Sequence, residues 1–412
     1  MAGLWRVLRA GLGFALCLSA LSCGGGSFGS SGGNPTPPPT GSNVVSVIVD
    51  DGPLPTTSAA INTLYTSVTV CLPGSTVNCQ TIDHIEVDTG SYGLRILASV
   101  MNATLKLPVQ LAPNGNSLVE CTQFVDGYSW GPVVAADVKI AGETAAAVPI
   151  QSIGDSRFPS VPADCSSTGN AEDTVATFGA NGILGIGPFV LDCPACENQV
   201  VPGTYYACTS TSCVGTMLPA QFQVSNVVAS FATDNNGTII QLPSVASAGA
   251  TRVTGTLAFG IDTQANNASG TQTVLTVDDN AELTIVFGGM PLSQSFIDSG
   301  SNANYFTDST LVLCTSTNYT GFYCPANTVS LPATIQGTNG VMTNNLVFQV
   351  GNALTMFSNP AAADYAAFPL LAGSNPNPQS FDFGLGFYYS RRVATAIENR
   401  TTSVGTGPYI AF

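Results

Sequence analysis

The chain has 412 residues, with 25 acidic residues against 10 Lys and Arg, and its formal net charge at pH 7 is −15. Such an acidic chain argues against a nucleic-acid partner, because phosphate backbones are bound by clustered basic side chains. The single histidine, His84, excludes sites built from several histidines, and we expect it to have a structural role. The length allows two substantial lobes rather than one core.

The N-terminal residues read as an export signal. Arg6 and Arg9 precede an apolar run over residues 10–21, which is too short for a typical membrane span. Small residues then lead to Cys23, in a pattern that resembles a bacterial lipobox. We therefore expect residues 1–23 to be a signal peptide, Cys23 to be lipidated, and the only membrane contact to be this lipid. Plain cleavage nearby is the alternative.

Residues 24–43 are rich in Gly, Ser and Pro, which predicts a flexible, partly stiffened tether. The expected location is therefore the cell envelope of a bacterium, either at the periplasmic face or at the outer-membrane surface.

Ten cysteines remain after Cys17 and Cys23 are set aside, and an even number in an exported chain predicts disulfides. Cys71 with Cys79, and Cys314 with Cys324, are plausible local pairs. Cysteines 193, 196, 208 and 213 could form a zinc site, but an oxidising compartment favours two disulfides. The sequence does not give the full connectivity.

From residue 44 onward, apolar and polar residues alternate, for example over residues 45–49, 66–70 and 136–140. This alternation predicts half-buried strands separated by Gly, Pro and Asn turns. Helical patterns are few, and the clearest cover residues 218–224 and 390–398. The expected fold class is therefore all-β with few short helices.

One short motif occurs twice. Ile85-Glu86-Val87-Asp88-Thr89-Gly90-Ser91 is followed, 298 − 88 = 210 residues later, by Phe296-Ile297-Asp298-Ser299-Gly300-Ser301. In each copy a strand pattern leads to an acid, a hydroxyl, a glycine and a second hydroxyl, which predicts a carboxylate delivered into a tight turn. Two such carboxylates face to face could share one proton, and so supply an acid and a base.

An apolar-glycine stretch follows each motif. Residues 181–187 lie 185 − 88 = 97 positions after the first acid, counted to Gly185, and residues 383–387 lie 386 − 298 = 88 positions after the second, counted to Gly386. A duplicated unit is the economical interpretation.

With both motifs in place, the chain resembles the pepsin-like aspartic proteases, and also an uncharacterised group of bacterial exported proteins with the same motifs. The resemblance covers most of residues 62–412 and includes residues 255–262 as the strand that closes the first lobe. It implies a bilobal fold of two related β-barrel lobes, residues 44–262 and 263–412, with a cleft between them.

The resemblance makes Asp88 and Asp298 a catalytic dyad that activates a water molecule. It implies that Thr89 and Ser299 bond across the lobe interface. The remaining motif residues would hold the two carboxylates through backbone N–H and hydroxyl groups: Gly90, Ser91, Gly300 and Ser301. No metal or organic cofactor is implied.

The sequence departs from this family in three places. Alignment puts Phe124 where the family has a flap tyrosine, with Tyr128 and Trp130 shortly after it as further flap candidates. Arg95 stands at the position of a family tryptophan. Glu86 lies where an apolar residue is expected. A buried Glu86 would raise the pKa values of the dyad, unless a cation such as Arg95 pairs with it. The alternative is that Glu86 faces the solvent.

The favoured function is an aspartic endopeptidase that cleaves peptide or protein substrates, and we expect a monomer. The alternative is a catalytically inactive pepsin-fold binding lipoprotein, which the altered flap favours and the two intact acids disfavour. A β-sandwich adhesin is a weaker third hypothesis, because it leaves the two apolar-glycine stretches unexplained.

Overall fold

The computed structural model describes residues 40–53, 60–124 and 127–412. The expected signal peptide, lipidation at Cys23 and most of the tether lie outside these residues. The described part is all-β with few helices, as predicted. Within it, no helix has both the length and the hydropathy that a membrane span needs.

Most strands belong to one sheet, which forms a long hydrogen-bonded path with one short strand branching off it. Its members are β1 Val44–Val49, β2 Leu64–Cys71, β3 Cys79–Asp88, β4 Tyr92–Leu97, β5 Ser117–Gln123, β6 Gly127–Ile140, β7 Glu143–Ile153, β8 Asn170–Ala171, β9 Gly182–Ile186, β10 Tyr205–Cys208, β11 Cys213–Gly215, β12 Gly237–Gln241, β13 Val253–Phe259, β14 Val274–Thr276, β22 Arg392–Ala396 and β25 Tyr409–Ala411.

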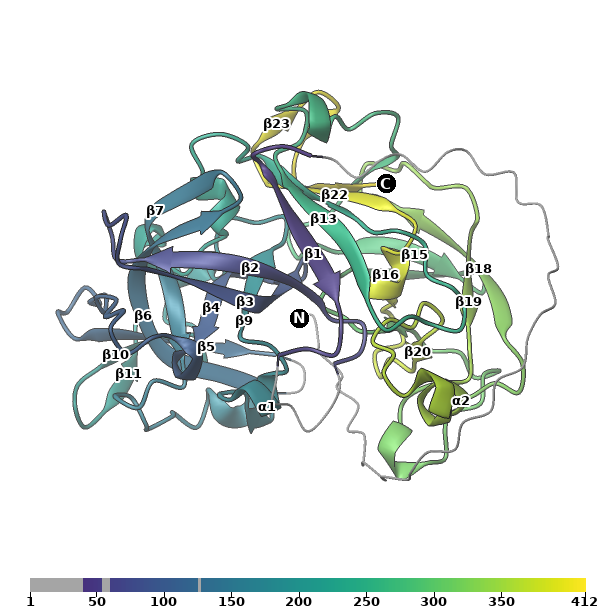
Figure 1. Cartoon of the computed structure of the whole chain (residues 1–412), viewed down its shortest axis with the longest axis horizontal. Helices are drawn as coiled ribbons and strands as arrows, with labels where there is room; N and C mark the ends of the chain where they lie inside the picture. The colour runs from purple at the N-terminus through teal and green to yellow at the C-terminus, as the bar shows by residue number, and fades with distance from the viewer. Residues whose placement is uncertain (1–39, 54–59, 125–126) are drawn as a thin grey trace, which may run out of the picture.

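A second sheet runs in the order β19-β18-β15-β16-β21-β17-β20. These strands are β15 Leu283–Phe287, β16 Met290–Ile297, β17 Asn304–Tyr305, β18 Val329–Gln336, β19 Leu346–Val350, β20 Ala372–Gly373 and β21 Asp382–Phe383; a separate hairpin pairs β23 Thr401–Thr402 with β24 Gly405–Thr406. In Figure 1 the strands β2–β11 lie on one side and β15–β20 on the other, with β1, β13 and β22 between them.

The helices are short. They are α1 Val175–Phe178, α2 Ala353–Ser358 and the 3-10 turns η1 Ala98–Val100, η2 Ser166–Thr168, η3 Pro194–Glu197, η4 Ala220–Phe222, η5 Val227–Ser230, η6 Ala265–Asn267, η7 Thr317–Tyr319, η8 Pro360–Ala362 and η9 Leu385–Phe387. The helix expected over residues 390–398 is wrong, because β22 occupies this segment and pairs with β12 and β25. Its β-branched Val393 and Thr395 suit these pairings, which override the local pattern.

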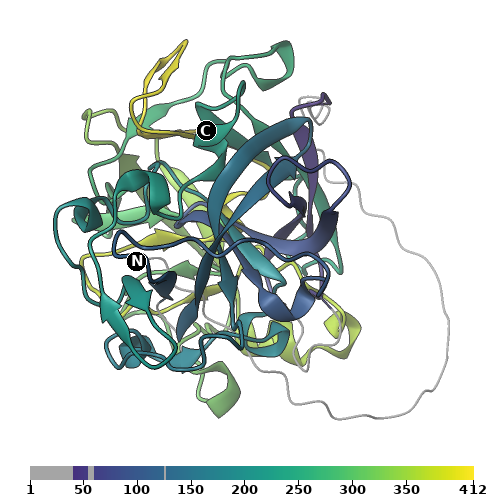
Figure 2. The ribbon, with the colours of Figure 1, turned by 90° about the vertical axis from the view of Figure 1, so that its left-hand side faces the viewer.

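The first part of the long path closes on itself. The pairings β2–β3, β3–β9, β9–β4, β4–β7 and β7–β6 continue into a pairing of β6 with β2. The ring is a barrel-like sheet, and its curvature is visible in the foreground of Figure 2. Val68, Val87 and Leu94 are fully buried within the largest hydrophobic cluster, so this ring holds β3, the strand that ends in Asp88, on a packed support.

Asn62 connects distant parts of the chain. Its side-chain amide donates to the carbonyl oxygens of Asn302 at 2.8 Å and Phe368 at 2.9 Å, and its oxygen accepts from the Phe368 N–H at 2.7 Å. Asn62 is 1% exposed, so these bonds replace its bonds to water. The chain just before β2 is thereby held against the segment that follows the second acidic motif.

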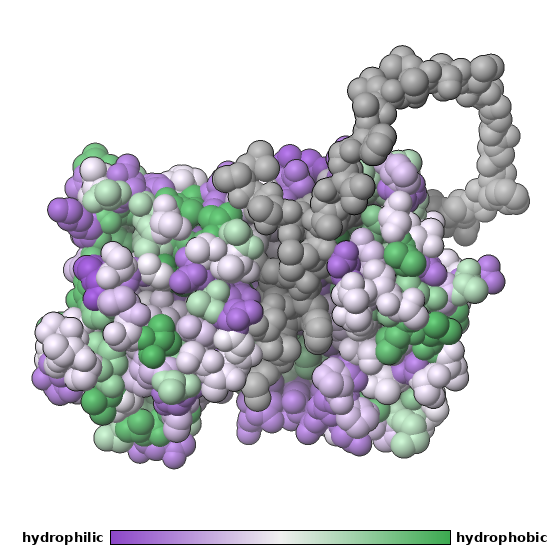
Figure 3. Space-filling model, turned by 90° about the horizontal axis from the view of Figure 1, so that it is seen from below, coloured by the Kyte–Doolittle hydropathy of each residue, from purple (hydrophilic) through white to green (hydrophobic). Residues whose placement is uncertain are grey.

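Exposed apolar residues are dispersed. The most exposed large ones are Val77 at 83%, Val214 at 65% and Met290 at 65%, and they belong to different elements. The face shown in Figure 3 likewise mixes hydrophobic and hydrophilic residues in small areas on both sides of the grey atoms.

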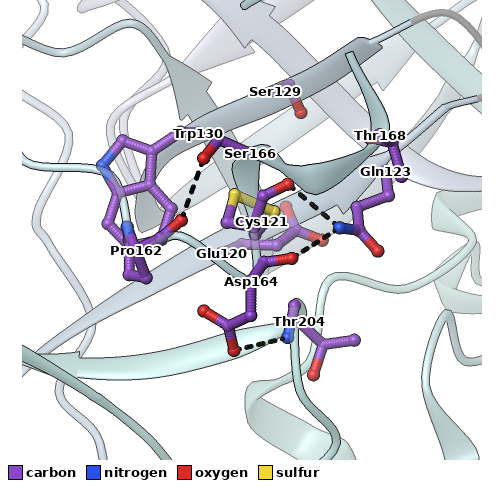
Figure 4. The surroundings of a disulfide bond; sticks show 12 residues. Glu120, Cys121, Gln123, Ser129, Trp130, Pro162, Asp164, Ser166, Thr168 and Thr204 are labelled. Atoms are coloured by element: carbon purple, nitrogen blue, oxygen red, sulfur yellow. Dashed lines mark hydrogen bonds between the residues drawn. A yellow bond between two sulfur atoms is a disulfide. The ribbon is translucent and has the colours of Figure 1, made fainter.

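The ten cysteines form five disulfides, which confirms the prediction of a disulfide-bonded chain. Both expected local pairs are present, and the cysteines considered for zinc form the pairs Cys193–Cys196 and Cys208–Cys213. The remaining disulfide, Cys121–Cys165, ties β5 to the segment before η2. Figure 4 shows Gln123 beside it, donating to two backbone carbonyl oxygens of that segment.

We expect each disulfide to stabilise the fold by an amount that increases with the logarithm of the number of residues in the loop that it closes. Cys121–Cys165 has a sequence separation of 44 and Cys71–Cys79 one of 8. Loop-closure entropy predicts that replacing both cysteines by alanine costs about 4 kcal/mol for the first pair and about 2.5 kcal/mol for the second. Urea unfolding measures both values. Equal losses, or a larger loss for the short loop, would contradict this account.

Candidate active site

Two strands bring the two motif acids to corresponding positions. β3 ends at Asp88 and runs parallel to β9, while β16 leads directly into Asp298 and runs parallel to β21. The Asp298 N–H donates to the carbonyl oxygen of Phe383 at 2.9 Å. Asp88 is 3% exposed and Asp298 is 1% exposed. Each apolar-glycine stretch therefore lies beside the strand that delivers an acid.

The two carboxyl groups lie close to one another around Gly300. A Cβ at this glycine would lie 2.5 Å from Oδ1 of Asp88 and 3.4 Å from Oδ1 of Asp298. Only a residue without a side chain fits between them. Burial raises the pKa of Asp298 well above its ordinary value, and the negative charges of Asp88 and Asp382 raise it further. Asp298 therefore keeps a proton more readily than an ordinary aspartate.

Each carboxylate receives the same set of hydrogen bonds. The Gly90 N–H donates to Oδ1 of Asp88 at 2.7 Å, and the Ser91 hydroxyl donates to Oδ2. In the second copy, the Gly300 N–H donates to Oδ1 of Asp298 at 2.9 Å and the Ser301 hydroxyl donates to Oδ2 at 3.1 Å. These donors fix the orientation of both carboxyl groups.

Thr89 and Ser299 join the two motif turns, in the way that the resemblance implies. The Thr89 N–H donates to Oγ of Ser299 at 3.1 Å, and the Ser299 N–H donates to Oγ1 of Thr89 at 2.9 Å. Ser299 also donates its hydroxyl to the carbonyl oxygen of Val87 at 2.8 Å. Because all these groups are buried, separating the turns would leave polar atoms unpaired.

A cavity of about 690 Å³ opens beside Asp298. The motif residues Thr89 and Gly90 line it, and so do Tyr92 and Phe189, whose rings pack edge to face. Its size lies within the range of small-ligand and peptide side-chain sites. Four further carboxylates line it: Asp192, Asp279, Glu282 and Glu398.

Glu86 and Arg95 lie on strands that flank β9. Both are opposite Ile183 in the strand register, and Glu86 is fully buried rather than facing the solvent. Arg95 forms ion pairs with Glu120 at 2.6 Å and Asp192 at 3.1 Å, two carboxylates that no sequence pattern relates to it.

Arg95 links the site to its surroundings. Glu120 lies on β5, Asp192 lines the cavity, and the Tyr205 hydroxyl contacts Asp192 at 2.7 Å. Burial raises the pKa of Asp192 well above its ordinary value and the charge of Glu120 adds to this rise, whereas Arg95 opposes it. Arg95 therefore binds the cavity wall to β4 and β5.

The flap candidates lie on one hairpin. β5 and β6 pair, and the Phe124 N–H donates to the carbonyl oxygen of Gly127 at 2.8 Å. Phe124 is buried against Phe178, whereas Trp130 packs on Tyr206 near the Cys121–Cys165 disulfide (Figure 4). Tyr128 is half-buried on β6. The described residues that line the 690 Å³ cavity include none of the three.

Sequence reasoning missed three residues of the site. Tyr92 lines the cavity, the Tyr388 hydroxyl lies 2.9 Å from Oγ1 of Thr89, and Asp382 is a third buried carboxyl group near the dyad. The signal for Asp382 was its place directly before Phe383-Gly384, because the corresponding residue of the first copy, Ile183, is apolar. Comparison of the two copies therefore reveals Asp382, because an acid stands where the first copy has an apolar residue.

We expect Arg95→Leu to lower the free energy of unfolding by about 3–5 kcal/mol, because it leaves Glu120 and Asp192 buried without their cation. The matched control is Arg157→Leu. Arg157 is 56% exposed and pairs with Asp155 on the surface, so its loss should cost at most about 1 kcal/mol. Urea unfolding of both variants tests this difference, and similar small losses would refute the structural role of Arg95.

A search of curated proteins finds no match to this chain. A family model described as a protein of unknown function, DUF3443, matches residues 39–412. This range includes both acidic motifs and all the residues that the structure describes. The chain therefore belongs to the DUF3443 family.

Proposed function

We propose that this protein is an aspartic endopeptidase with a pepsin-like bilobal fold, exported and held at the cell envelope by a lipid on Cys23. The observation that carries the proposal is the pair of buried carboxyl groups, Asp88 and Asp298, which lie close together at Gly300 and are each held by the backbone N–H and the serine hydroxyl of their own turn. The closed ring of strands around β3 and the corresponding parallel pairs β3–β9 and β16–β21 support two related lobes, residues 44–262 and 263–412.

The chemistry uses the raised proton affinity of Asp298. With Asp88 ionised and Asp298 protonated, a water molecule between them loses a proton to Asp88 as its oxygen attacks the scissile carbonyl carbon. Asp298 gives its proton to the carbonyl oxygen, which yields a neutral tetrahedral diol. Asp88 then returns a proton to the leaving nitrogen while Asp298 takes one back from a diol hydroxyl, and the C–N bond breaks.

The cavity beside Asp298 supports an extended peptide as substrate, since its volume of about 690 Å³ suits side chains next to the scissile bond. The alternative function is a silent binding module. One observation favours it: Phe124, at the position of the flap tyrosine, carries no hydroxyl and is buried against Phe178.

The test is cleavage of a reduced and alkylated protein by the full-length chain in detergent micelles, from pH 3 to pH 7.5. We expect Asp88→Asn and Asp298→Asn each to lower kcat/KM by about 10²–10⁴-fold or more, because each removes a proton-transfer group. The matched control is Asp137→Asn. Asp137 lies on β6, outside the motifs, and accepts hydrogen bonds from the backbone N–H groups of Gly74 and Ala147.

We expect the control to retain cleavage. A folded parent that cuts at no pH in this range would favour the binding module, and equal cleavage by the dyad variants would point to a contaminating protease.

A further inference from the structure

A separate cavity of about 160 Å³ lies in the C-terminal half of the fold. Among the described residues, none lines both this cavity and the 690 Å³ cavity beside Asp298. Its walls are mainly apolar and include the rings of Phe348, Phe383 and Phe387. The Phe383 ring packs against the other two, at centroid distances of 5.6 Å and 5.1 Å. About five water molecules would fill this volume, so it suits a ligand the size of one amino-acid residue.

Asn304 places a buried amide at the wall of this cavity. The residue is 3% exposed, and its Oδ1 has no hydrogen-bond partner in the part of the chain that the structure describes. Its backbone does not depend on this amide, because the Asn304 N–H donates to the carbonyl oxygen of Leu371 at 3.1 Å. A buried amide oxygen without a donor is costly, and an apolar residue of similar size would avoid the cost. A ligand with an N–H or O–H group would supply the missing donor.

Gly386 leaves space in front of this amide. A Cβ at Gly386 would lie 3.9 Å from both Oδ1 and Nδ2 of Asn304, and its nearest atom would be the carbonyl oxygen of Pro369 at 3.3 Å. The backbone of Gly386 is outside the left-handed region, so its conformation does not demand glycine. In the strand register Gly386 corresponds to Gly187, where a Cβ would lie only 2.8 Å from the carbonyl oxygen of Thr89. The first glycine is thus required by close packing, whereas the second borders the cavity.

Arg391 supplies a cation at the same cavity. Its guanidinium carbon lies 4.5 Å from the centroid of the Phe387 ring, and its Nη1 donates to the carbonyl oxygen of Phe387 at 2.6 Å. Arg391 forms no ion pair with any described residue, although the chain has 25 acidic residues against 10 Lys and Arg. Burial lowers the pKa of Arg391 below its ordinary value. The remaining N–H groups of its planar guanidinium match the geometry of a carboxylate.

We propose that this cavity binds an apolar amino-acid residue through its carboxylate and its α-nitrogen, either as the free amino acid or as the C-terminal residue of a peptide. The carboxylate pairs with Arg391, the N–H donates to Oδ1 of Asn304, and the side chain packs against the phenyl rings. An amino-acid residue combines these three groups within the available volume. The site excludes the dyad, so the proposal does not rest on the proposed function.

The first experiment compares ligands that each lack one group. Isothermal titration calorimetry of the full-length protein in detergent micelles measures the Kd of L-valine, of valinamide, which lacks the carboxylate, and of 3-methylbutanoate, which lacks the N–H donor. We expect saturable binding of valine and at least about tenfold weaker binding of each analogue, because each loses a charged hydrogen bond. N-acetylvaline identifies the source: binding tighter than that of valine assigns the cavity to peptide C-termini, and weaker binding assigns it to the free amino acid.

The second experiment locates the binding. Asn304→Leu removes the acceptor, and Arg391→Met removes the charge but keeps an unbranched stem over Phe387. Each should weaken the binding of valine by at least about tenfold. The matched control is Arg400→Met, which should bind valine as the parent does. Arg400 is also half-buried and donates to a backbone carbonyl oxygen, that of Ala229 at 3.3 Å, but it does not line the cavity.

If Asn304→Leu does not fold, Arg391→Met carries the test. A folded parent that binds neither valine nor N-acetylvaline would overturn the proposal, and so would unchanged binding in both cavity variants. A protein that cleaves nothing, but whose valine binding is weakened in Arg391→Met and not in Arg400→Met, would refute the proposed function and leave this site standing.

Discussion

The reciprocal hydrogen bonds between Thr89 and Ser299 are the constraint on which the rest of the site depends. Each residue donates its N–H to the other's hydroxyl oxygen, so neither turn can shift without breaking both bonds. The residues are 210 positions apart, which means that two distant strands must be built and packed before the bonds can form. Once formed, these bonds fix the separation of the Asp88 and Asp298 carboxyl groups, because each acid directly precedes one of the two bonded residues.

This fixed separation explains why burial of the acids can be useful. Water would solvate two carboxylates, whereas here Asp88 and Asp298 are nearly excluded from solvent and each depends on the donors of its own turn. The cost of burying the charge is offset by backbone N–H and serine hydroxyl groups that are already oriented. The donors match in the two copies, but the surroundings differ, because Asp382 has no acidic counterpart at Ile183.

The sequence predicted the local features well. Alternation identified β-strands, and the two motifs identified Asp88, Asp298 and their supporting residues, because each depends on a few adjacent positions. The strand β22 was missed, because its identity depends on pairing with β12 and β25. The partners of Arg95 were also missed: Glu120 and Asp192 are 25 and 97 residues away, and no local pattern relates them. Asp382 could have been noticed from the repeat, but its burial near the motif acids required coordinates.

The most direct measurement of the central claim, that the two acids act as one hydrolytic unit, is product analysis by mass spectrometry in H₂¹⁸O. An unfolded protein substrate is incubated with the full-length chain or with the Asp88→Asn, Asp298→Asn double variant. The account predicts new carboxyl termini carrying one ¹⁸O from the parent and none from the double variant. Labelled termini from the double variant, or a folded parent that produces none at any pH, would contradict it.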